Sequence, residues 1–198
     1  FELAHIWDCD KETGVWKKTS RLQSSVPPEI LFIERCTQFL APGGRMGIVL
    51  PDSILGSPGL GYIREWMIQN HRIVASIDLN ADTFQPRNGT QTSVLILQKK
   101  TQEQRDAEEK SGKMADYNIF MAMVEKVGHD KRGNPLFKRD NEGNEILVPD
   151  TNSVLVLGET GDGQRTVSHE QKVKVEDDQT PDVPAIFAEW KKQEGLGW

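Results

Sequence analysis

The sequence predicts an α/β fold, and two observations carry that prediction. Short apolar runs at 46–50, 73–79 and 93–97 are bounded by glycine, proline or polar residues, as buried strands are. Amphipathic segments at 27–40 and 61–70 alternate with the first two runs and predict helices. Helices that alternate with strands are typical of a sheet with crossover helices.

The first helix is expected to begin at Pro27 and Pro28, because a first-turn proline loses no intrahelical hydrogen bond. Ser24 or Ser25 could cap it. Glu34 is expected on the exposed face, together with Arg35 and Gln38. The apolar stripe predicted to face the core consists of Ile30, Leu31, Ile33, Cys36, Phe39 and Leu40.

The run 46–50 is short, continuous and apolar, so we expect a strand buried on both faces. The connection 80–92 between the last two strands is polar and contains no helical pattern. An antiparallel pair needs no crossover helix, so these two strands are expected to be antiparallel. The buried stripe of the second helix is predicted to be Tyr62, Ile63, Trp66 and Met67.

Composition divides the chain into an irregular arm at 1–26, an α/β body at 27–125 and an extension at 126–198. The turn signals Lys131-Arg132-Gly133-Asn134 and Asn141-Glu142-Gly143-Asn144 predict a hairpin within 128–148. The remaining expectations are a surface helix at 101–114, a strand within 117–124, a loop or weak strands at 150–182 and a short helix at 183–193.

Charge is uneven along the chain, whose formal net charge is −6. The first 100 residues hold 11 basic and 10 acidic residues, whereas the rest hold 13 basic and 20 acidic ones. An acidic half repels phosphate, so this chain alone should not bind DNA tightly. Cys9 and Cys36 form neither a disulfide framework nor a zinc pattern. No apolar run reaches the roughly 20 residues that cross a bilayer, and a cytoplasmic protein without a membrane partner is expected.

Three patterns suggest chemistry but are incomplete. The glycine loop at 56–61 precedes a helix and could cradle phosphate, but Arg64 breaks the dinucleotide fingerprint, which favours a plain loop. The spacing of Asp8, Asp10 and Glu12 resembles a calcium loop without its required glycine. The histidines are scattered without metal-binding spacing, so we expect surface residues at His5, His71, His129 and His169. No metal site is predicted.

Phe84 is an aromatic residue in the otherwise polar loop 80–91. Two roles are open to it. Most aromatic side chains serve packing, so local chemistry alone favours a ring that plugs the core. A ring that stays exposed in a polar loop could instead stack on a nucleic-acid base.

Taken in sequence order, the helix, strand and loop segments described above resemble the methyltransferase (modification) subunit of type I restriction-modification systems. The later segments 117–122 and 127–133 also resemble that family, and 150–198 match it only loosely. The segments that carry the resemblance are Ser24–Phe32, Leu40–Asp52, Arg64-Glu65, Phe84 and Gly89–Ile96.

The resemblance implies part of a Rossmann-like fold that uses S-adenosylmethionine, with the three apolar runs as its fifth, sixth and seventh strands. The family flips an adenine out of the DNA duplex and methylates its N6 amino group. By this match Phe84 stacks on the flipped base. Specificity and restriction subunits are the implied protein partners.

The donor-binding glycine motif and the catalytic Asn/Asp-Pro-Pro-aromatic motif are both missing, since Val26-Pro27-Pro28-Glu29 lacks the acceptor and the aromatic residue. We therefore expect an inactive fragment that binds no cofactor by itself and self-associates through an unpaired sheet edge. Two alternatives remain: an interaction module that docks another protein through 101–198, and a fragment of a nucleotide-binding oxidoreductase.

Overall fold

The computed structural model describes the backbone of residues 1–157 and 164–198, and the side chains of 1–151 and 170–198. The chain runs through β1 (His5–Cys9), β2 (Trp16–Leu22), α1 (Pro28–Phe39), β3 (Arg45–Pro51), α2 (Asp52–Gly56), the 3₁₀ turn η1 (Pro58–Leu60), α3 (Gly61–Asn70), β4 (His71–Asp78), β5 (Thr92–Lys99), α4 (Gln102–Ser111), β6 (Phe120–Met123), β7 (Leu147–Leu157), β8 (Gln164–Lys174) and α5 (Asp182–Gln193).

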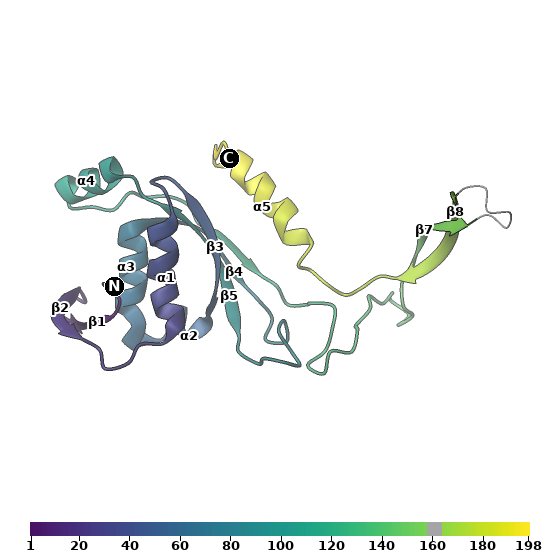
Figure 1. The fold of residues 1–198 in the computed structure, drawn as a ribbon, viewed down its shortest axis with the longest axis horizontal. Helices are drawn as coiled ribbons and strands as arrows, with labels where there is room; N and C mark the ends of the chain where they lie inside the picture. The colour runs from purple at the N-terminus through teal and green to yellow at the C-terminus, as the bar shows by residue number, and fades with distance from the viewer. Residues whose placement is uncertain (158–163) are drawn as a thin grey trace.

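The body is built on a mixed sheet with the strand order β3-β5-β4-β6. Strand β5 lies antiparallel to both β3 and β4, whereas β6 extends β4 in parallel. Helices α1 and α3 pack side by side on one face of this sheet (Figure 1). The three predicted strands are therefore neighbours, and the expected α/β class, a partial Rossmann-like sheet, is confirmed, as is the antiparallel β4–β5 pair.

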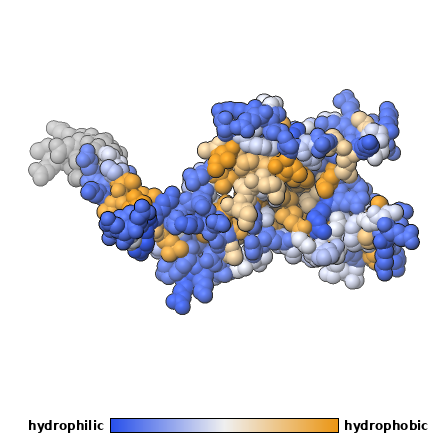
Figure 2. Space-filling model, turned by 180° about the vertical axis from the view of Figure 1, so that it is seen from behind, coloured by the Kyte–Doolittle hydropathy of each residue, from blue (hydrophilic) through white to orange (hydrophobic). Residues whose placement is uncertain are grey.

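Strand β3 was expected to be buried on both faces, and this is wrong. It is an edge strand of the described sheet, and the Val49 side chain is 49% exposed. On the face away from α1 and α3, helix α5 covers only part of the sheet, where Phe187 and Trp190 pack on Phe120 with centroid separations of 5.2 and 5.6 Å. Apolar surface accordingly remains visible near the middle of the molecule from behind (Figure 2).

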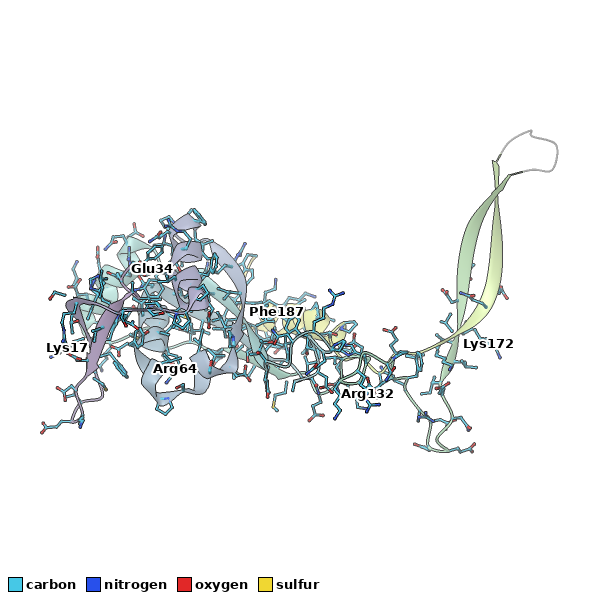
Figure 3. The ribbon with its side chains drawn as sticks, turned by 60° about the horizontal axis from the view of Figure 1, so that its bottom comes forward. Lys17, Glu34, Arg64, Arg132, Lys172 and Phe187 are labelled. Atoms are coloured by element: carbon cyan, nitrogen blue, oxygen red, sulfur yellow. The ribbon has the colours of Figure 1, made fainter. Side chains whose placement is uncertain are left out.

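Helix α1 forms where predicted, but its cap and its buried face differ from the prediction. Its N-cap residue is Pro27, and no side chain caps it. Phe39 is 79% exposed, whereas Glu34, expected on the exposed face, is buried. The reason is the amino-terminal segment, which folds back so that the amides of Glu2 and Leu3 each donate to the Glu34 carboxylate at 2.9 Å. Figure 3 marks the position of Glu34 on the helix.

Residues 1–26 were expected to be irregular, but strands β1 and β2 pair there in antiparallel fashion. The hairpin is held to the body because Trp7 and Trp16 pack around Tyr62, each with a ring-centroid separation of 5.8 Å. Leu3 is fully buried in the same cluster. Because the segment is polar, its sequence did not indicate this hairpin, which Trp7 and Trp16 hold against the body.

His71 was expected at the surface and is instead fully buried. Its Nδ1 lies 3.1 Å from the carbonyl oxygen of Met67, and its Nε2 lies 3.0 Å from the hydroxyl of Thr37. Burial lowers the pKa of the imidazole from 6.5 to about 4, so it is a neutral core residue at neutral pH. The side chain of His169 lies outside the described residues.

The downstream elements follow the prediction more closely. Helix α4, strand β6 and helix α5 form as expected, and α4 starts with a capping box between Thr101 and Gln104. Two differences concern the hairpin. Within the segment 128–148, where a hairpin was expected, the structure has two turns with the isolated bridges His129–Pro135 and Arg139–Glu145. Strands β7 and β8 instead pair over 147–174, where mainly a loop or weak strands were expected, and they project from the body (Figure 1). They flank residues 158–163, the part of the expected 150–182 loop that lies outside the described residues. Within the described backbone, no helix is both long and apolar enough to cross a membrane.

Candidate functional site

The loop 80–91 joins β4 to its antiparallel neighbour β5 and is organised by its own polar groups. The Asn80 side chain accepts a hydrogen bond from the amide of Asp82 at 2.7 Å. The carbonyl of Phe84 accepts from the amides of Arg87 and Asn88 at 3.2 and 3.0 Å. These short-range bonds give the loop a defined shape without burying its side chains.

Phe84 lies within this loop, and its side chain is 42% exposed. It belongs to neither of the two apolar clusters of the body. For comparison, Tyr62 and Trp66 are 6% and 4% exposed. A ring that plugged the core would be as buried as those two, so the packing interpretation does not describe Phe84.

A second segment, 126–136, lies against the loop. A Cβ placed on Gly133 would be 3.3 Å from Cδ of Pro86, so the two segments are in close contact. Asn80 also donates to the carbonyl of Glu125 at 2.6 Å. A cavity of about 100 Å³ between the segments is lined by Asn80, Asp82, Glu125, Lys126, Val127, His129, Leu136 and Asp177. This volume is well below that of typical ligand pockets, which start near 300 Å³, so a base would have to bind outside it.

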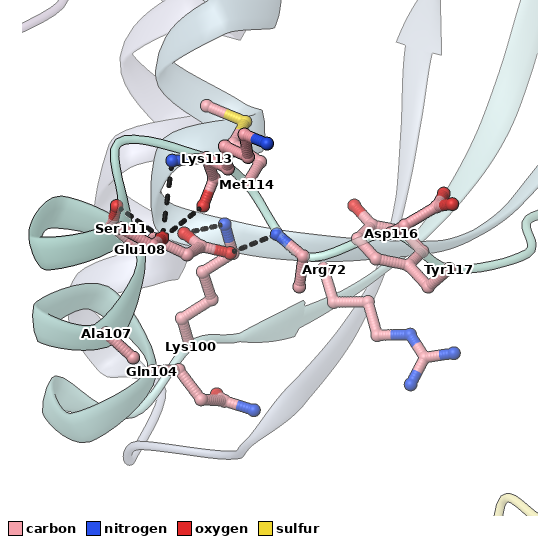
Figure 4. A pocket seen from close by; sticks show the side chains of 11 residues that line it. Arg72, Lys100, Gln104, Ala107, Glu108, Ser111, Lys113, Met114, Asp116 and Tyr117 are labelled. Carbon is pink, nitrogen blue, oxygen red and sulfur yellow. Dashed lines mark hydrogen bonds and ion pairs between the residues drawn. The ribbon is translucent and has the colours of Figure 1, made fainter.

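A larger cavity of about 540 Å³ lies at the other end of β4 and β5, beside α4 (Figure 4). Two of its charged groups have partners within the cavity wall. Lys100 forms an ion pair with Glu108 at 2.7 Å, and the guanidinium of Arg72 lies over the Tyr117 ring, 5.0 Å from its centre. Among the described residues, the buried Nε of Arg72 has no hydrogen-bond partner. No local sequence pattern indicates this cavity, because its walls combine Arg72 with the distant segment 100–117.

The glycine loop at 56–61 does not cradle a ligand. A Cβ on Gly61 would lie 2.7 Å from Nε1 of Trp16, so the glycine is needed for packing. Arg64 donates to the carbonyls of Ile54 and Ser57 at 2.9 Å each and holds the loop closed (Figure 3). This loop therefore does not present free amides to the phosphates of a dinucleotide, which adds to the evidence against the oxidoreductase alternative.

The acidic pattern at the amino terminus forms the turn between β1 and β2. The Asp10 carboxylate accepts from the amides of Glu12 and Thr13 at 2.9 and 3.2 Å, and these bonds lower its pKa. Within the described side chains, no group of three or more histidine, cysteine or acidic residues could hold a metal ion. Both cysteines are free thiols.

Among solved structures, the chain is similar to a protein from Listeria monocytogenes described as a class I S-adenosylmethionine-dependent methyltransferase, with 20% identity, a TM-score of 0.40, and coverage of 53% of this chain and 30% of that one. It is also similar to a structure from Vibrio vulnificus YJ016 described as the modification subunit of a type I restriction enzyme, with 16% identity, a TM-score of 0.35, and coverage of 54% and 20%.

The chain thus spans less than a third of the length of either solved protein. No curated protein matches it significantly. The model of the family described as N-6 DNA Methylase matches residues 5–143, which is more than half of the chain and includes the sheet, the loop 80–91 and the turn that contacts it. The chain therefore belongs to the N-6 DNA methylase family.

Proposed function

We propose that the chain is part of a DNA adenine-N6 methyltransferase, the modification subunit of a type I restriction-modification system, and that it supplies the target-base side of the site. One observation carries this proposal: Phe84 is exposed on a self-organised loop at the end of the β4–β5 pair, in a member of a DNA methylase family. The remaining surface of the loop is polar, as expected for a strand-to-strand connection that faces a nucleic acid.

Phe84 has no group that could transfer a proton, so its role would be to hold the base. An extruded adenine loses its stacking partners in the duplex, and an aromatic ring replaces part of that stacking at about 1–3 kcal/mol per base. The loop's internal hydrogen bonds would keep the ring in place before the base arrives. S-adenosylmethionine would supply the methyl group, bound by residues outside this chain.

Methyl transfer by the full-length enzyme tests this proposal. With duplex DNA and S-adenosylmethionine, mass spectrometry of the digested product is expected to show N6-methyladenine. Phe84→Ala should lower the rate by about 10- to 100-fold, which is the loss of one base-stacking contact. Phe84→Trp, which keeps an aromatic ring, is the matched control and should retain most of the rate. Methylation at cytosine, or an unchanged rate for Phe84→Ala, would contradict the proposal.

The chain by itself is proposed to be inactive, because its glycine loop is closed by packing and a catalytic Asn/Asp-Pro-Pro motif is absent from its sequence. Calorimetric titration of the isolated chain with S-adenosylmethionine should therefore give no heat of binding. Micromolar binding would show that a donor site exists within these residues. We also propose DNA, a specificity subunit and a restriction subunit as partners in the complete complex, in the cytoplasm.

A second candidate function is a docking module for another protein, formed by residues 101–198. It is favoured by the projecting β7–β8 hairpin, at whose base Leu147 and Val148 are 51% and 40% exposed. The open edge of β3 is a separate candidate for self-association. Light scattering of the isolated chain should show dimers or larger species, and a monodisperse monomer at high concentration would argue against that edge contact.

A further inference from the structure

Two tight turns in the extension share one framework but differ at their tips. The sequences Asp130-Lys131-Arg132-Gly133-Asn134 and Asp140-Asn141-Glu142-Gly143-Asn144 have aspartate, glycine and asparagine at the same three positions. Both glycines have positive φ, of 82° and 89°. The framework is therefore a repeated structural unit, and the two tip residues are what distinguish one copy from the other.

The framework of the first turn is held by Asp130. Its carboxylate accepts hydrogen bonds from the amides of Arg132 and Asn134 at 2.8 and 2.9 Å, and from the side chain of Asn134 at 2.9 Å. These bonds, led by the Asn134 side chain, lower the pKa of the Asp130 carboxyl. The second turn repeats the arrangement around Asp140. The Asp130 carboxylate is thus engaged by hydrogen bonds within the turn, and residues 131 and 132 at the tip are exposed.

The tip of the first turn is basic and exposed. Lys131 and Arg132 are both exposed, and in the described part of the chain neither forms an ion pair with a carboxylate. Lys126, in contrast, pairs with Asp177 at 2.9 Å. The segment 126–139 holds five basic residues and one acidic residue, although the second half of the chain is acidic. Basic residues therefore outnumber acidic ones in this segment.

The first turn also lies beside the loop that carries Phe84. Gly133 is in contact with Pro86, whereas a Cβ placed on Gly143 would meet nothing within 4 Å. Arg87, in the same loop as Phe84, is a further exposed cation without an ion pair among the described residues. If a nucleic acid placed a base against Phe84, its phosphates would therefore lie close to Lys131 and Arg132 of the first turn.

We propose that the turn Asp130–Asn134 is a phosphate-binding element that holds the DNA backbone next to the extruded base through Lys131 and Arg132. The inference rests on the proposed function, because it takes the ligand of the Phe84 loop to be DNA. Arginine and lysine are the side chains that contact DNA phosphates, and such contacts position the duplex without reading its sequence. The second turn, with asparagine and glutamate at its tip, lacks the charge for this role.

The test is the salt dependence of DNA binding by the full-length enzyme with the subunits it needs. Each lost phosphate contact lowers the slope of log affinity against log salt by about 0.9. Lys131→Gln with Arg132→Gln is therefore expected to reduce that slope by about 1.8 and the affinity near 0.1 M salt by about 10- to 100-fold. Lys17→Gln with Arg21→Gln removes the same charges from strand β2, on the far side of the body from Arg132 (Figure 3), and should change the slope little.

The rate of methyl transfer at saturating DNA separates this inference from the proposed function. The Lys131/Arg132 variant should need a higher DNA concentration to reach half of its maximal rate, because its defect lies in holding the backbone, whereas Phe84→Ala should lower the maximal rate itself. A slope equal to that of the unmodified enzyme, or equal slopes for the Lys131/Arg132 and Lys17/Arg21 variants, would overturn the phosphate contact. A reduced slope with an unaffected Phe84→Ala rate would retain the basic turn as a DNA contact and refute the role of Phe84.

Discussion

The two ends of the β4–β5 pair use polar residues in opposite ways. At the end formed by His71, Arg72 and Lys100, charged and polar side chains are largely buried and bonded to one another. At the other end, Phe84 and Arg87 stay exposed on a loop that is held by its own turns and by contacts of Asn80 and Pro86 with the segment 125–133. The first end fixes the strands and the second is free to meet a ligand. Binding residues on a loop that a rigid scaffold positions are a common arrangement in enzymes.

If this contrast is correct, the largest change in stability should come from Glu108→Ala. Lys100 is 5% exposed, and among the described residues its ammonium donates hydrogen bonds to the Glu108 carboxylate and the carbonyl of Ile68. Removing the carboxylate leaves a buried charge uncompensated, which costs about 3 kcal/mol in the free energy of unfolding. Urea unfolding measures this cost, and Glu109→Ala, at an exposed neighbouring position, is the control. A loss below about 1 kcal/mol would show that the pair is not a buried anchor.

A smaller change is expected from pH, through His71. Its pKa is about 4 in the folded protein and 6.5 in the unfolded chain, so the unfolded chain binds more protons between these values. The stabilisation is complete above pH 6.5 and is lost as the pH falls toward 4. Unfolding curves at pH 6.5 and 5 should differ by roughly 2 kcal/mol. His71→Gln should flatten this dependence, and an equally steep curve for that variant would assign it to other groups.

Thr37→Val should have an effect of about 1 kcal/mol, the net value of a typical buried hydrogen bond. The substitution keeps the shape of the side chain but removes the hydroxyl that lies 3.0 Å from Nε2 of His71. Thermal unfolding at pH 7.5 would report the difference, with Thr13→Val in the exposed β1–β2 turn for comparison. The same hydroxyl donates to the carbonyl of Ile33 at 2.8 Å, so equal shifts for both variants would mean that the contacts of the Thr37 hydroxyl with Ile33 and His71 add no stability.

The smallest effect is expected at the loop end. Arg87→Gln removes an exposed cation without an ion pair among the described residues, so the free energy of unfolding should change by less than about 0.5 kcal/mol. The same denaturation experiment gives the value. If Arg87→Gln lowered the free energy of unfolding as much as Glu108→Ala does, the two ends of the β4–β5 pair would not differ in their contribution to stability.

The strands of the sheet could be predicted from the sequence, but features that depend on contacts between segments far apart in the chain could not. Strands β3, β4 and β5 were predictable because each is a short apolar run with clear boundaries. The burial of Glu34 was not, because its partners are amides 31 and 32 residues away. The hairpin β1–β2 was missed because its apolar contacts are two tryptophans that pack on α3 rather than an alternating pattern.

The candidate site was only partly predictable for the same reason. Phe84 could be singled out because it is the aromatic residue in a polar loop, but only the fold shows that its ring remains exposed. The contact between Pro86 and Gly133 joins residues 47 positions apart, and no local pattern indicates it. The turn signals at 130–134 and 140–144 were visible in the sequence, whereas the different surroundings of the two turns were not.

The central claim, that Phe84 contacts the extruded base, is tested most directly by a thermodynamic cycle. The affinity of the full-length enzyme and of Phe84→Ala would be measured for a duplex with adenine at the target position and for the same duplex with an abasic site there. We predict that Phe84→Ala weakens binding of the adenine duplex by about 5- to 150-fold more than binding of the abasic duplex, since stacking contributes about 1–3 kcal/mol. An equal loss for both duplexes would show that Phe84 does not contact the base.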